Sequence, residues 1–371
     1  MPKYQPLFSL PRQKRALLLL EWCTAFRPAG SIWVLLLALR SFSLVEIGTA
    51  EGLFHVVSLC CELPSGLLAD VMGRKRTLVA SFAMFLISAL LMAGSSGFGG
   101  ACLSLAVSAV GYNLQSGTRE SITYESMLQA GREAEYLKFS SLQNGVYRFS
   151  NGGAMLLAGA TALLGWRTAY LLDAGIALMG LAAALSLTEP VCEGREKGGA
   201  ALSSLPEALG ETVRGVWALL RSDSAAVGIM LANALVGACA TLTWFFLQQR
   251  VEAAVTVPAL LGPALFVLGL GGGLAGLLTG RLDRLSYGRA ASLVGAGTAV
   301  CALLARGTSL PALLCSGLAA ELLGDALNLV SDKRLNDCFP SAQRATLVSV
   351  SSMAFSLFMI PLSPLFGWFF T

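Results

Sequence analysis

Residues 66–78 read GLLADVMGRKRTL, and this stretch joins two long apolar runs through a short charged turn. A helix needs about 20 consecutive apolar residues to cross the hydrocarbon core of a bilayer. Runs of that length recur along the 371 residues, which are 55% hydrophobic and only 13% charged. A soluble domain carries about a quarter charged residues, so the composition predicts an all-α membrane protein.

Eleven apolar runs are long enough to be transmembrane helices. The longest gap, 189–224, separates six of them from five. We therefore predict an N-terminal six-helix bundle over 1–188, a cytoplasmic linker over 189–224 and a C-terminal five-helix bundle over 225–371. The runs cover residues 16–39, 45–69, 77–94, 100–128, 137–163, 167–187, 225–249, 257–281, 289–306, 309–331 and 345–369.

The linker carries two different patterns. Leu209, Val213, Val216 and Leu220 share one helical face, which predicts a helix lying on the membrane surface. The first half of the linker, VCEGREKGGA, fits a flexible connection equally well.

Lysine and arginine are distributed unevenly between alternate gaps. Nineteen lie in one set of gaps, whereas the other set holds only Arg40, Arg167, Arg250 and Arg306. Cytoplasmic loops carry the excess of basic residues, so the first set is predicted to be cytoplasmic. The N-terminus is then cytoplasmic and Thr371 extracytoplasmic, in the cytoplasmic membrane. The net charge of +4 comes from these loops and indicates contact with lipid rather than with nucleic acid.

Other patterns argue against metal and cofactor chemistry. The nine cysteines form no C-x-x-C pair and lie mostly inside apolar runs, so we expect small buried hydrophobes. His55 is the only histidine. Gly271–Gly276 fits G-x-G-x-x-G but lies inside an apolar run, where glycines favour close helix packing instead. We expect no cofactor, no metal and no enzyme activity. The basic N-terminus leads straight into a full-length apolar run, so no removable signal peptide is predicted.

The opening stretch resembles the loop signature of the major facilitator superfamily, G-x-L-a-D-r-x-G-r-k-x-x-l. Further stretches, 62–66, 116–125 and 344–346, are similar to a bacterial, drug-efflux-like branch. The family usually has twelve spans, so this resemblance implies that the last helix is missing here. The proline of the drug-antiporter signature is also absent from the fifth run. The matching positions of the loop are Gly66, Leu68, Asp70, Gly73, Arg74, Lys75 and Leu78, with Val71 where the family is usually basic.

The resemblance also implies a gate on the cytoplasmic side. Gly73 would permit a tight turn, and Asp70 would face the N-terminus of the eleventh helix, near Arg344. Arg74 would pair with Glu125. The alternative is that Arg74, Lys75 and Arg76 merely fix the topology. The gating candidates are Gly66, Asp70, Gly73, Arg74, Lys75, Glu125 and Arg344.

Ionisable residues inside the apolar runs are functional candidates, because each costs about 3 kcal/mol or more at the centre of a bilayer. Glu321 and Asp325 share a helical face, and we hypothesise that they exchange protons while pairing with Arg27 or Arg148. Hydrogen bonding to Asn328 is the alternative. The proton-coupling candidates are Glu21, Glu62, Glu120, Glu321 and Asp325.

His55 shares a face with Ser58 and Glu62 in the second run. A proton relay between His55 and Glu62 is one interpretation. A hydrogen bond from His55 to a neighbouring helix is the one that we favour.

Polar stripes run along the fourth and fifth apolar runs and predict the lining of a central cavity. Hydrogen bonding between helices is the alternative for each stripe. The resemblance implies a secondary transporter of a small organic molecule, monomeric and proton-coupled, with export first, uptake second and a non-transporting sensor or scaffold third. The cavity candidates are Arg27, Asn113, Arg119, Asn144, Tyr147, Arg148, Asn151 and Trp244, with Tyr112, Ser116 and Thr123 on the same stripes.

Overall fold

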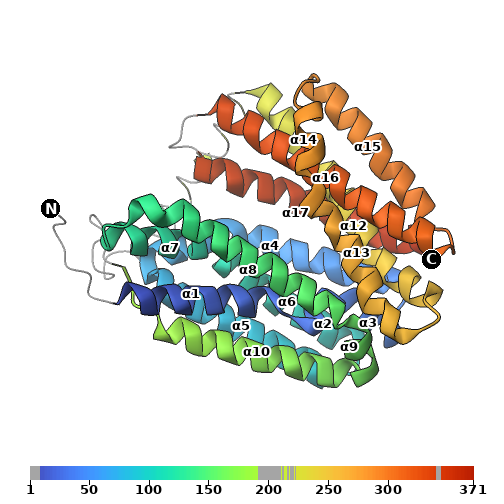
Figure 1. Cartoon of the computed structure of the whole chain (residues 1–371), viewed down its shortest axis with the longest axis horizontal. Helices are drawn as coiled ribbons and strands as arrows, with labels where there is room; N and C mark the ends of the chain where they lie inside the picture. Colours follow the sequence, from blue (N-terminus) through green and yellow to red (C-terminus); the bar gives the residue numbers. More distant parts are fainter. Residues whose placement is uncertain are drawn as a thin grey trace. The chain divides into compact units, whose positions relative to one another are not determined.

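The computed structural model describes residues 9–190, 223–339 and 344–371, together with 210, 213, 214, 217 and 221 (Figure 1). Side chains of the last range are described from residue 347 onward. All regular secondary structure within these ranges is helical. The flexible segment predicted for the linker lies outside the described residues. Of the four apolar residues of the predicted surface helix only Val213 is described, and it is helical and exposed.

The helices of the first half are α1 (Leu10–Ala25), α2 (Pro28–Ser31), α3 (Trp33–Leu39), α4 (Leu44–Met72), α5 (Arg74–Gly94), α6 (Phe98–Gln115), α7 (Thr118–Gln129), η1 (Glu133–Glu135), α8 (Tyr136–Leu156), α9 (Ala158–Leu164) and α10 (Trp166–Ser186). The second half contains α12 (Ser224–Ala254), η2 (Pro258–Leu260), α13 (Leu261–Leu274), α14 (Gly276–Leu282), α15 (Tyr287–Leu304), α16 (Leu310–Cys338) and α17 (Arg344–Phe370).

Eight segments of the described chain are long and apolar enough to cross a membrane, and each coincides with a predicted run. They are α4, α5, α10, α12, the stretch Pro258–Leu282, α15, α16 and Leu347–Phe370.

The other three predicted runs, 16–39, 100–128 and 137–163, are each broken into shorter helices. The first breaks before Pro28, since a residue that precedes proline avoids the helical conformation. The second breaks at Gly117, which has a φ of 70°. The third breaks at Leu157, between α8 and α9. The eleven transmembrane helices therefore stay a prediction, with eight matched by candidate spans in the described ranges and three coinciding with broken segments.

The chain folds into two compact units. The first unit comprises Met1–Ser31, Cys60–Ala154 and Arg167–Thr212, and the second comprises Ile32–Leu59, Met155–Trp166 and Val213–Thr371. The predicted bundles 1–188 and 225–371 stay a prediction.

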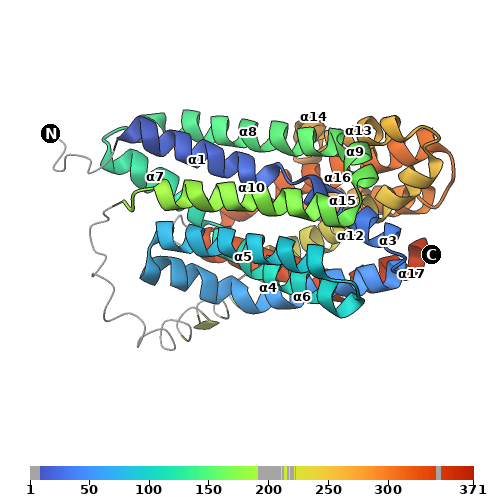
Figure 2. The same ribbon diagram turned by 90° about the horizontal axis from the view of Figure 1, so that it is seen from below.

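The core of the first unit lies between α1, α5, α7 and α10, and Figure 2 shows α1 and α10 side by side. Leu20, Phe82 and Ile122 are almost fully buried there. The ring of Phe82 occupies the position that a side chain at Gly180 would take. Such contacts matter because lipid supplies no hydrophobic force between helices, so their association depends on close packing.

The second unit is built around α16, which packs against α12, α13, α14 and α15. The backbone of α13 at Gly271 lies directly against the carbonyl oxygen of Leu318 on α16. The α4 and α17 helices approach in the same way, with Gly52 against the Ile360 carbonyl. The predicted packing role of the 271–276 glycines is therefore confirmed at Gly271.

Candidate functional site

A buried ion pair joins α1 to α7 in the first unit. The break at Gly117 restarts the helix at Thr118, so Arg119 lies in the first turn of α7. Arg119 Nη1 donates to Glu21 Oε2 at 2.7 Å, and Glu21 is only 7% exposed. Glu120 Oε1 lies 3.8 Å from Arg119 Nη2. One guanidinium therefore holds one carboxylate tightly and a second one loosely.

These residues line a cavity of about 350 Å³. Polar side chains of α8 form its other wall, and because they recur every three or four residues they share one helical face. The guanidinium carbon of Arg119 lies 6.0 Å from the centre of the Tyr147 ring. The lining consists of Glu21, Arg119, Glu120, Thr123, Tyr136, Ser140, Gln143, Asn144 and Tyr147.

The structure brings together five of the predicted site residues at this cavity, namely Glu21, Arg119, Glu120, Asn144 and Tyr147. It adds Tyr136, Ser140 and Gln143, which extend the predicted stripe toward the start of α8. The same helical period would have found them in the sequence. Glu62 lies nearby, since it and Glu120 both act electrostatically on Tyr112.

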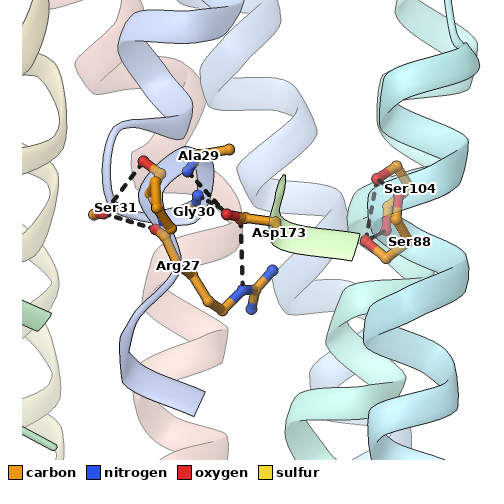
Figure 3. A network of polar contacts seen from close by, with 8 residues as sticks. Arg27, Ala29, Gly30, Ser31, Ser88, Ser104 and Asp173 are labelled. Atoms are coloured by element: carbon orange, nitrogen blue, oxygen red, sulfur yellow. Dashed lines mark hydrogen bonds and ion pairs between the residues drawn. The ribbon is translucent and has the colours of Figure 1, made fainter. Parts of the chain in front are cut away.

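Arg27, by contrast, lies at the break between α1 and α2, beside Asp173 (Figure 3). The buried carboxylate of Asp173 accepts hydrogen bonds from the backbone N–H groups of Ala29 at 3.1 Å and Gly30 at 2.9 Å. Arg27 Nε lies 3.8 Å from the same carboxylate. Arg27, predicted as a partner of Glu321 and Asp325, thus has Asp173 as its acid. Sequence spacing could not show this contact, because Arg27 and Asp173 lie far apart in the sequence.

Other cavity candidates lie apart from this lining. Asn113 is buried and donates to the Ala109 carbonyl of its own helix. Arg148 is exposed and forms no ion pair with the part of the chain that the structure describes. Asn151 lies farther along α8, and Trp244 belongs to α12 in the second unit, 5.7 Å from the Phe245 ring.

The loop signature forms a compact network in the first unit. Arg74 pairs with Asp70 at 2.7 Å and with Glu125 at 3.4 Å, which confirms the predicted Arg74–Glu125 pair. The Glu189 carboxylate accepts hydrogen bonds from the backbone N–H groups of Arg74 and Lys75, each at 2.7 Å. Glu189 therefore caps the N-terminus of α5.

Gly73 has a φ of 96°, and a Cβ there would lie 2.9 Å from the Glu189 carboxyl carbon. Its conformation and its contact both require glycine. Among the described residues, no neighbour lies within 4 Å of a Cβ placed on Gly66. The side chain of Arg344 lies outside the described residues, so its contact with Asp70 stays a prediction, as does the gating role of this network.

Two carboxylates outside the spans have lowered pKa values. The hydrogen bond from Lys14, at 3.1 Å, holds the pKa of Glu135 below its usual value. The hydrogen bond from Lys333 does the same to the pKa of Asp283, assisted by the charge of Arg334. Both acids favour their ionised form at neutral pH.

The acidic pair of α16 faces the glycines of α13 in the second unit. A Cβ on Gly272 would meet Asp325 Oδ2 and lie 3.9 Å from Glu321 Oε2, so the predicted common face is confirmed. Asn328 instead accepts a hydrogen bond from Asn233 at 2.8 Å. The bare backbone of Gly272 leaves space for the Asp325 carboxylate between the two helices.

His55 hydrogen-bonds a neighbouring helix, as predicted. Its Nδ1 lies 3.1 Å from Ser356 Oγ on α17, and its Nε2 lies 3.4 Å from Glu51 Oε1 on α4. The acid at His55 is thus Glu51, one turn before it, and not the predicted Glu62. Both His55 and Glu51 are only 7% exposed.

The described ranges are all helical, with eight candidate spans and a polar cavity, as in a polytopic membrane protein. The model of the Major Facilitator Superfamily matches residues 23–364, and the chain belongs to this family. No curated protein matches the sequence.

Solved structures share the fold. A mutant form of the nucleoside transporter NupG has a TM-score of 0.75 at 15% identity, covering 96% of this chain and 90% of that one. A bacterial homologue of the human lysosomal transporter Spinster, inward-facing and unoccupied, has a TM-score of 0.71 at 18% identity, covering 96% and 82%. A D-xylose–proton symporter has a TM-score of 0.66 at 14% identity, covering 96% and 89%. Identities this low show the fold alone.

Proposed function

We propose that the chain is a secondary active transporter that moves a small organic molecule across the cytoplasmic membrane by alternating access, with export coupled to protons. The observation that carries this proposal is the cluster of Glu21, Arg119 and Glu120, with Glu21 buried, at a cavity of about 350 Å³. That volume is typical of a pocket for a small molecule. Membership of a transporter family supports the same conclusion.

The free-energy cost of burying charges favours a functional role for the cluster. Removing an ion pair from water costs several kcal/mol per ion, and apolar residues of similar size often stabilise a fold as well. Intramembrane charges are therefore retained mainly where they bind or move something. Glu21 and Arg119 form such a pair, and its cavity gives a solute access to it.

Proton coupling rests on the surplus of acids. Glu120 lies 3.8 Å from an Arg119 that already binds Glu21, so one of the two carboxylates can take up a proton when the other holds the arginine. Glu321 and Asp325 are a second pair of close acids, in the second unit. We assign both groups to proton uptake and release.

Gating is assigned to the loop network of Asp70, Arg74 and Glu125, with Gly73 and Glu189 holding the start of α5. We place this network and the N-terminus on the cytoplasmic side because of the excess of basic residues there. The working unit is a monomer. Proton-coupled uptake is the second candidate function, favoured by the absence of the drug-antiporter proline from residues 145–153.

The test is flux in proteoliposomes. The full chain is reconstituted and exposed to a panel of labelled organic solutes, with and without a pH gradient. At least one solute should move faster when the gradient is imposed, and its direction separates export from uptake. A panel on which no solute moves above protein-free vesicles would contradict transport. Solute flux that does not depend on the pH gradient would contradict proton coupling.

A further inference from the structure

The charges around the cavity do not balance. Glu21 and Glu120 line it against the single guanidinium of Arg119. Two carboxylates and one guanidinium leave an excess of one negative charge. An uncompensated carboxylate in a low-dielectric site is costly, so the site attracts a positive charge.

The same cavity has one unfilled acceptor. Arg119 uses Nη1 for Glu21 at 2.7 Å, whereas Glu120 is 3.8 Å away, beyond hydrogen-bonding distance. Glu120 forms no hydrogen bond within the described ranges, and its side chain is 58% exposed.

The remaining lining residues narrow the chemical class of the ligand further. Amides and hydroxyls come from Gln143, Asn144, Ser140 and Thr123, which suits a hydrophilic molecule. Tyr136 and Tyr147 add aromatic rings, whose faces attract cations.

We propose that the ligand of this cavity is a hydrophilic organic cation, an ammonium on a molecule that also carries a hydroxyl or carbonyl oxygen. The ammonium binds Glu120, and the oxygen accepts a hydrogen bond from the amides or hydroxyls of the lining. An organic anion would meet the excess carboxylate, and a neutral solute would leave it uncompensated. This inference rests on the proposed function, since it names the cargo class of the same site.

The test uses pairs of ligands that differ only in charge. Tyramine and tyrosol have the same skeleton, with the ammonium of one replaced by a hydroxyl in the other. Choline and 3,3-dimethyl-1-butanol form a second pair. Isothermal titration calorimetry of the detergent-solubilised full chain measures the affinity of each. The Glu120→Gln variant removes the charge and keeps the shape, and Glu133→Gln alters an acid of the first unit outside the cavity.

In at least one pair, the amine should bind the unaltered chain about tenfold or more tightly than its neutral partner, a moderate factor because Glu120 is partly exposed. Glu120→Gln should remove most of that difference, whereas Glu133→Gln should preserve it. Equal affinities within each pair, an unchanged preference in Glu120→Gln, or no binding of either amine would overturn the proposal. Thermal unfolding of both variants shows whether a loss reflects folding.

Separate measurements of binding and of transport distinguish the proposed ligand class from the proposed transporter function. Amine binding without flux in proteoliposomes would overturn the transporter and leave the ligand class standing. Gradient-driven flux of neutral solutes without amine binding would overturn the ligand class and leave the transporter standing.

Discussion

The ion pair between Glu21 and Arg119 should couple α1 to α7 energetically. Breaking a fully buried pair by removing one partner costs about 3–5 kcal/mol, because the other charge is left unpaired. Glu21 is 7% exposed, but the side chain of Arg119 is 20% exposed and also lies near Glu120. We therefore expect Glu21→Gln to cost less, about 2–3 kcal/mol.

A double-mutant cycle measures this coupling without assigning the whole loss to one residue. Glu21→Gln, Arg119→Gln and the double variant are unfolded with SDS in mixed micelles, with tryptophan fluorescence as the readout. The double variant should be more stable than the sum of the single losses predicts, by about 1.5–3 kcal/mol. Lys14 and Glu135, a more exposed pair at 3.1 Å, provide the control cycle and should couple more weakly. Additive losses at Glu21 and Arg119 would refute the reasoning.

Three further predictions concern the supporting contacts. Gly73→Ala should destabilise the first unit by about 1–3 kcal/mol, because its φ of 96° strains an alanine and its Cβ meets Glu189; thermal unfolding measures the loss. Gly272→Ala should force α13 away from α16, because its Cβ meets Asp325, and should destabilise the second unit; thermal unfolding measures the loss. The pKa of Asp283 is lowered, so its contribution to stability should be full above the usual aspartate pKa and be lost as the pH falls through the lowered value; unfolding at graded pH measures it.

Each of these predictions has a matched control. Gly66→Ala and Gly273→Ala place a methyl group where no neighbour lies within 4 Å, so both should be tolerated. Asp283→Asn should remove the acid-side loss that depends on the lowered pKa. Equal effects of Gly73→Ala and Gly66→Ala, or of Gly272→Ala and Gly273→Ala, would show that steric contact is not the cause. A stability profile that is the same with and without the Asp283 carboxylate would contradict the third prediction.

Local patterns in the sequence predicted the membrane spans and the residues that share a helical face. Apolar runs located the eight candidate spans because a bilayer imposes a minimum length on each helix. The spacing of Glu321 and Asp325 placed them on one face of α16, since residues four apart always share a face. The polar stripe of α8 was recognised at Asn144 and Tyr147 for the same reason.

Contacts between segments far apart in the sequence could not be predicted from such patterns. Glu189 follows α10 and Asp173 lies within it, yet they cap α5 and α2, and nothing in their own neighbourhoods indicates those partners. The helix breaks at Pro28 and Gly117 had a visible signal, because both residues disfavour an unbroken helix. These two residues indicate the broken segments that position Arg27 and Arg119, although the hydropathy of each run is continuous.

Solute flux through variants of the cavity shows whether the cluster of Glu21, Arg119 and Glu120 serves transport. The full chain, Arg119→Gln, Glu120→Gln and Glu133→Gln are reconstituted in equal amounts, and the flux of one transported solute is followed under an imposed pH gradient. We expect flux near that of the unaltered chain for Glu133→Gln and a loss for both cavity variants. Undiminished flux in Arg119→Gln and Glu120→Gln would contradict this expectation.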